Sequence, residues 1–208
     1  MGPFNAVSTH LGRPGRDIDD YIPIVFLRDP IDRARSVYRF VRQDSTQPGH
    51  AAAASRSFRD FIDWSLSSQE DGVVIRDYQT IHLSDASFRS GHILQAKAEQ
   101  RDLDQAIALL SSWAAVGVTR RFAQSLRRFN AAYGDRFPGL FTGEVCANVT
   151  KAGYVSDRHE WAEARLELGP ALFERLVEAN ALDIALHRWA VQRLAEPVAA
   201  TLETAVGG

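Results

Sequence analysis

The sequence predicts an α/β protein in which a parallel sheet is flanked by helices. Two short apolar runs, at 24–27 and 115–118, are rich in β-branched residues and typical of buried strands. A segment with helical periodicity follows each run, which is the order of elements that builds a parallel sheet covered by helices. With 208 residues, 45% of them hydrophobic, the chain suits one domain, which we assign to residues 1–208.

The first strand ends at Arg28, before an aspartate and a proline. Proline fixes the backbone and lacks an amide donor, so a helix over 30–42 is predicted, with Asp29 as its N-cap and Pro30 as its first residue. A helix N-terminus offers free backbone amides and the positive end of a dipole, so we expect this junction to accept an anion. Arg28 would add a fork of donors and Ser36 a hydroxyl. The alternative is an ordinary strand–helix junction with solvated arginines.

Amphipathic periodicity predicts further helices over 57–66, 102–113, 119–133 and 182–194, and one that starts at Pro170. Thr119 is expected to cap the third of these, and Gly134 to end it. We expect Arg120 and Arg121 to be solvated at its start, because like charges there oppose the helix dipole.

Composition excludes several classes of function. The net charge of −2 argues against a nucleic-acid partner. Cys146 is the single cysteine, so no disulfide can form within the chain, and no Cys/His cluster has the spacing of metal ligands. No apolar run approaches the roughly 20 residues that cross a bilayer, and no signal peptide is visible. We therefore expect a cytoplasmic protein with no membrane span.

The residues around the first junction resemble a known family. The string FLRDPIDRARSVY, residues 26–38, looks like the 3′-phosphate-binding segment of sulfotransferases that use 3′-phosphoadenosine 5′-phosphosulfate (PAPS). The resemblance is strongest to carbohydrate sulfotransferases of the heparan-sulfate 2-O-sulfotransferase-like group, and it continues in order, more weakly, over most of the chain. In that family an arginine that ends a strand and a serine eight residues later hold the 3′-phosphate. Arg28 and Ser36 have this spacing.

The resemblance implies a P-loop-like sulfotransferase fold and transfer of a sulfuryl group from PAPS to an acceptor hydroxyl, on a carbohydrate or a small molecule. By its place in the chain, His10 would be the base that deprotonates the acceptor, and Lys151 would contact donor phosphate or sulfate. Arg33 and Arg35 are lesser candidates for charge stabilisation. The alternatives are an exposed loop histidine and a surface lysine. In-line transfer can rely on positioned donors and a base, so no metal is expected.

Two other segments resemble the family. The string VGVTRRFAQSL, residues 116–126, matches a segment in which the position of Arg120 is usually a glutamate. Tyr78, Gln79 and His82 fall where the family lines the acceptor side of the cleft. A surface helix with one buried aromatic is the alternative that we favour for these three residues.

One part of the family pattern is missing. No Gly/Thr/Ser-rich loop with a lysine, which in the family holds the 5′-phosphosulfate, occurs in the sequence. We expect an N-terminal truncation. A degenerate homologue that binds a nucleotide or anion without catalysis, or a site in which other residues replace the loop, are the alternatives. Loss of the strand before that loop would expose sheet edges, which makes a homo-oligomer a further expectation.

Overall fold

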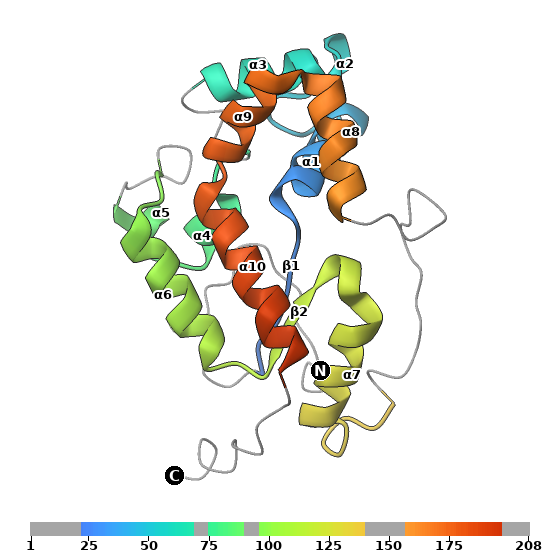
Figure 1. Ribbon diagram of the computed structural model, residues 1–208, viewed down its shortest axis with the longest axis vertical. Helices are drawn as coiled ribbons and strands as arrows, with labels where there is room; N and C mark the ends of the chain where they lie inside the picture. The colour runs from blue at the N-terminus through green and yellow to red at the C-terminus, as the bar shows by residue number, and fades with distance from the viewer. Residues whose placement is uncertain (1–21, 69–74, 90–95, 140–156, 197–208) are drawn as a thin grey trace.

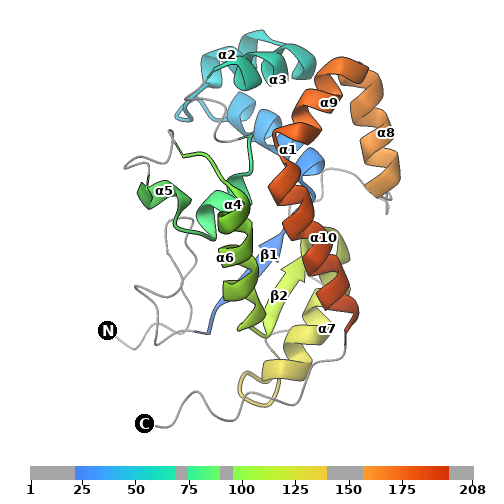
Figure 2. The same ribbon diagram turned by 60° about the vertical axis from the view of Figure 1, so that its left-hand side comes forward.

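The computed structural model describes four ranges of the chain, 22–68, 75–89, 96–139 and 157–196. Near its centre, strand β1 (Ile24–Leu27) pairs in parallel with strand β2 (Ala115–Val118), so that Ile24 lies opposite Ala115 and Leu27 opposite Val118. These two strands form the sheet of the described part, and the other elements there are helices (Figures 1 and 2). The α/β class and both predicted strands are confirmed.

Helices cover both faces of this sheet. Successive side chains of a strand point to opposite faces. Val116 and Val118 therefore share one face, where they pack with α6 (Gln100–Ser111) and α10 (Ala181–Ala195). Ala115 points the other way and packs with Phe129 of helix α7, whose bounds are Phe122–Tyr133. Figure 1 shows α7 on one side of the strands and α10 and α6 on the other.

Gly117 allows α7 to lie close to the sheet. A Cβ atom at this position would lie 2.8 Å from the ring of Phe129 and 2.8 Å from the Cβ of Ser125. The same contact places the Ser125 hydroxyl where it accepts the N–H of Val118, at 3.0 Å. Glycine is required here because a side chain would force α7 away from β2.

Helix α1 (Pro30–Gln43) leads from the sheet to a second hydrophobic core. That core joins α1 to α2 (His50–Ser55), α3 (Phe58–Ser67), α8 (Asp157–Leu168) and α9 (Pro170–Glu178). Figure 1 shows these helices gathered at one end of the molecule. The predicted helix starts at Pro30 and Pro170 are confirmed, whereas α8 was not predicted.

Two short helices, α4 (Tyr78–His82) and α5 (Ala86–Arg89), follow α3 in the chain. Helix α4 packs against both α6 and α10, and it lies beside the end of β1 (Figure 2). Within the described ranges, every helix is too short or too polar to span a membrane.

The predicted cap of α7 is wrong. A 3₁₀ turn, η3 (Thr119–Arg121), precedes the helix, and Arg121 takes the N-cap position. The Thr119 hydroxyl donates instead to the carbonyl of Leu27, at 3.1 Å. Parallel pairing brings the ends of β1 and β2 together, so this carbonyl is within reach of the threonine.

Candidate anion-binding site

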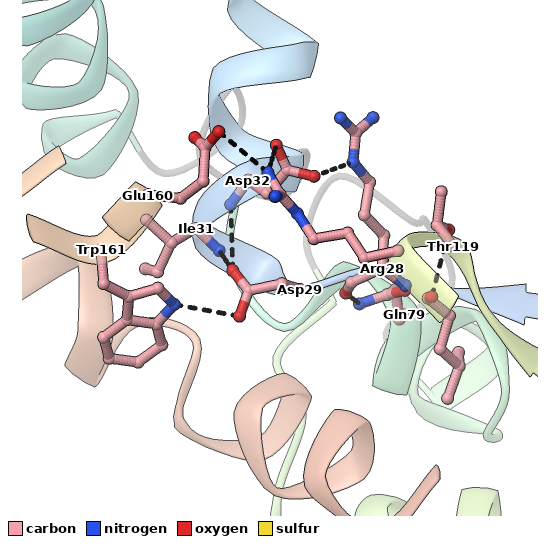
Figure 3. Close-up of polar contacts among 10 residues, drawn as sticks. Arg28, Asp29, Ile31, Asp32, Gln79, Thr119, Glu160 and Trp161 are labelled. Carbon is pink, nitrogen blue, oxygen red and sulfur yellow. Dashed lines mark hydrogen bonds and ion pairs between the residues drawn. The ribbon is translucent and has the colours of Figure 1, made fainter. Parts of the chain in front are cut away.

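The candidate site lies where both strands end. Because β1 and β2 are parallel and in register, Arg28 and Thr119 leave the sheet at the same edge. Ligands of open α/β sheets bind at the carboxyl ends of the strands. Figure 3 shows the polar contacts that connect Arg28 to its neighbours at this edge.

Asp29 closes the N-terminus of α1. Its Oδ1 accepts the N–H groups of Ile31, at 2.9 Å, and of Asp32, at 3.1 Å, while its carbonyl accepts the N–H of Arg33, at 2.8 Å. Its Oδ2 accepts the indole N–H of Trp161 in α8, at 3.0 Å (Figure 3). The predicted N-cap is confirmed, but the expectation of free amides is wrong, since the Asp29 carboxylate already uses them. An anion at this edge must therefore be held by side chains.

The side chain of Arg28 is held at one nitrogen only. Its Nε donates to Oδ2 of Asp32, at 2.7 Å, one turn into the helix. Both Nη groups have no hydrogen-bond or ion-pair partner among the described residues, and they point away from Asp32 (Figure 3). The side chain is 34% exposed, so these two donors can reach a ligand.

Asp32 lies between two arginines. Nη2 of Arg120 is 3.1 Å from Oδ1 of Asp32 and also 3.1 Å from Oε1 of Glu160 in α8. Burial alone would raise the pKa of Asp32, but the hydrogen bonds and charges of Arg28 and Arg120 outweigh it and hold the pKa below its ordinary value. Asp32 is therefore ionised at neutral pH. The expectation of a solvated Arg120 is wrong, because ion pairs with partners distant in sequence leave its side chain only 20% exposed.

Ser36 lies on the same face of α1 as Asp32, one turn further on, because residues four apart on a helix are neighbours. It is partly buried, and its hydroxyl has no hydrogen-bond partner within the described ranges. Arg39, three residues beyond, continues this face and likewise has no ion-pair partner in that part of the chain. This face of α1 thus carries Asp32, Ser36 and Arg39. Arg28, which precedes the helix, reaches the same face through its contact with Asp32.

The lesser candidates have other contacts. Arg35 pairs with Glu167 of α8, at 2.7 Å. The guanidinium of Arg33 lies 4.0 Å from the ring centre of Tyr78, and burial lowers its pKa. Both arginines thus connect helices to one another, and their part in charge stabilisation stays a prediction.

Gln79 has a role that the sequence did not indicate. Its Oε1 accepts the backbone N–H of Arg28, at 2.9 Å, and its Nε2 donates to the backbone carbonyl of Arg28, at 2.9 Å (Figure 3). The ring of Tyr78 lies 3.9 Å from that of His82 as well as under Arg33. Gln79 and Tyr78 thus contact the end of β1 and the start of α1, and their place on the acceptor side stays a prediction.

His10 and Lys151 lie outside the described residues, so their roles stay predictions. Among the residues that sequence reasoning missed, Asp32 gave the clearest signal, because it follows Arg28 by four positions. Gln79 was named only for the acceptor side, and its contact with Arg28 gave no signal, since 51 positions separate the two residues.

Comparison with known proteins adds a distant relative. An uncharacterised protein of Archaeoglobus fulgidus is 24% identical over 181 residues, which make up 86% of this chain and 68% of the archaeal protein. No family model and no solved structure matches the chain. An identity of 24% does not assign a family.

Proposed function

We propose that the chain binds the 3′-phosphate of PAPS through Arg28 and Ser36 and transfers the sulfuryl group to an acceptor hydroxyl on a carbohydrate or a small molecule. The observation that carries this proposal is that the Arg28 guanidinium is held at Nε alone. Asp32 holds its Nε at 2.7 Å, and both Nη groups are left for a ligand beside the helix face that bears Ser36.

These donors suit a phosphate monoester. The two Nη groups of a guanidinium match two phosphate oxygens in a bidentate contact, and a serine hydroxyl can donate to a third. Arg39 adds positive charge on the same face. A doubly charged terminal phosphate gains more from such a cluster than a singly charged diester does.

In the proposed reaction, the acceptor oxygen attacks sulfur while the bond from sulfur to the bridging phosphate oxygen breaks. His10 would take the acceptor proton, as a base with a near-neutral pKa can. The products are a sulfate ester and adenosine 3′,5′-bisphosphate. Lys151 is the proposed further contact to donor phosphate or sulfate.

The proposal extends to the fold. A strand that ends at an arginine, a helix that follows at once, and a parallel neighbour whose end lies at the same edge support a P-loop-like sulfotransferase arrangement. The helices on both faces of β2 also support it.

Calorimetric titration with adenosine 3′,5′-bisphosphate and with adenosine 5′-phosphate tests the proposed site. Arg28→Ala should weaken bisphosphate binding about 10- to 100-fold, the value of a charge-assisted hydrogen-bond pair, and Ser36→Ala up to about tenfold. Neither variant should change binding of the 5′-phosphate. Arg101→Ala is the matched control, because Arg101 is 59% exposed and pairs with Glu99 on the surface of α6.

A folded wild type that does not prefer the bisphosphate would contradict the proposal. Where binding follows the prediction, incubation with PAPS and a panel of sugar acceptors tests transfer. Binding that depends on Arg28 without transfer to any acceptor would favour the alternative, a nucleotide-binding homologue without catalysis.

A further inference from the structure

We propose that Gln79 is a positioning residue of the anion site, which acts through the backbone of Arg28 to fix where the guanidinium meets the phosphate. This inference rests on the proposed function, because it assigns a purpose to the geometry of Arg28. It concerns a residue of α4 that lies 51 positions away in the sequence.

The first observation is the two-point contact itself. The register of the sheet ends at Leu27 and Val118, so the peptide groups of Arg28 lie beyond the paired part of β1. Gln79 replaces a strand partner there, accepting from the N–H and donating to the carbonyl of Arg28, both at 2.9 Å. A carboxamide carries both a donor and an acceptor, which few side chains do, so it can hold both groups of one residue.

The second observation is that Gln79 is itself held firmly. The carboxylate of Asp183 accepts its backbone N–H, at 3.0 Å, and its Nε2, at 3.3 Å. The same carboxylate accepts the N–H and the hydroxyl of Thr80, at 2.7 and 2.8 Å. In return, Oδ1 of Asp77 accepts the N–H groups of Leu182 and Asp183, at 3.0 and 2.9 Å. Helices α4 and α10 thus cap each other.

The consequence for Arg28 is a backbone that is fixed on both sides. Asp29 fixes the chain after it by capping α1, and Gln79 fixes Arg28 itself. The guanidinium then reaches Asp32 through Nε and keeps its Nη groups for the ligand. A fixed backbone matters because a bidentate contact depends on the angle between the guanidinium plane and the phosphate.

A double-mutant cycle tests whether Gln79 acts through Arg28. Gln79→Met keeps the length of the side chain and removes both hydrogen bonds. In the wild-type background it should weaken binding of adenosine 3′,5′-bisphosphate about tenfold and leave binding of adenosine 5′-phosphate unchanged. In the Arg28→Ala background it should change bisphosphate binding less than about twofold, because the group that it positions is gone.

Gln124→Met is the matched control. Nε2 of Gln124 donates to the carbonyl of Leu194, at 3.2 Å, so this glutamine also joins a helix to a backbone group, but far along α10 from Arg28. The control variant should lose stability without a change in bisphosphate affinity. Hydrogen exchange of the Arg28 amide, measured by NMR in the free protein, should become faster in Gln79→Met and stay unchanged in Gln124→Met.

The outcomes separate this inference from the proposed function. If the wild type shows no preference for the bisphosphate, or Arg28→Ala retains it, both are overturned. If Arg28→Ala removes the preference while Gln79→Met leaves it intact, or weakens binding equally in both backgrounds, the positioning role alone is overturned.

Discussion

Asp183 offers the most direct test of how the corner between α4 and α10 is held. Its carboxylate is fully buried and accepts four hydrogen bonds from Gln79 and Thr80. Thr80 is also fully buried, so its two donors cannot turn to water when the carboxylate is removed. The charge of Asp183 also favours the protonated form of the half-buried Arg33, and the variant would lose this effect.

The expected loss follows from these contacts. Removing the charged partner from a buried, hydrogen-bonded network costs about 3–5 kcal/mol. For a chain of this size each kcal/mol lowers Tm by about 2–4 °C, so Asp183→Ala should lower Tm by about 6–20 °C. Asp183→Asn should lower the free energy of unfolding less, because the carboxamide keeps one oxygen acceptor. Some loss remains, because its NH₂ group would face the donors of Gln79.

Urea unfolding followed by circular dichroism at pH 7 measures this loss. Asp63→Ala is the control, because its carboxylate is 56% exposed and pairs with Arg175 on the surface, and it should cost less than about 1 kcal/mol. An Asp183→Ala variant as stable as the Asp63→Ala control would refute the reasoning, since the carboxylate would then not hold the two helices together.

Three further predictions concern Asp77 in the same corner and two contacts elsewhere in the fold. Burial, with the charge of Asp183 added, raises the pKa of Asp77 to about 7, so the free energy of unfolding should fall as pH rises from about 4 through 7. Urea titrations across that range should show a smaller fall in Asp77→Asn, and an equal fall would contradict the assignment. Gly117→Ala should cost about 1–3 kcal/mol in urea, because the added methyl group meets α7 at 2.8 Å; an unchanged midpoint would show that α7 moves freely. Trp161→Phe keeps a ring but removes the donor to the buried Asp29, and should cost about 1–3 kcal/mol in the same assay; a neutral effect would mean that the Asp29 carboxylate needs no indole.

Local chemistry determined much of what the sequence could predict. The apolar runs at 24–27 and 115–118 are strands because β-branched residues fit a buried pleated surface. Pro30 and Asp29 mark the start of α1 because one lacks a donor and the other supplies an acceptor within three residues. Predictions of this kind depend on neighbours in the chain.

Contacts between distant segments were the ones that the sequence could not indicate. Arg120 was expected in solvent, but its partners Asp32 and Glu160 come from α1 and α8. Gln79 reaches Arg28 across 51 positions, and Asp183 reaches Gln79 across 104. Nothing in the periodicity of a helix tells which element will lie beside its end, so polar partners of this kind become visible only with the fold.

The candidate site differs in one physical respect from an anion site at a helix N-terminus. Asp29 accepts the N–H groups at the start of α1, so these amides cannot donate to an anion. The side chains of Arg28 and Ser36 would therefore bind it. Asp32 then has two opposing effects. Its charge partly offsets that of Arg28, which weakens attraction for a phosphate. Its hydrogen bond to Nε also fixes a side chain that otherwise carries about 2 kcal/mol of rotamer entropy, which lowers the cost of ordering it around a ligand. Arg120 also pairs with Asp32, so the negative charge of Asp32 is divided between two arginines and offsets less of the charge of Arg28. The hydrogen bond that orders the Arg28 side chain is retained. The arrangement therefore favours an oriented bidentate contact over a general attraction for anions.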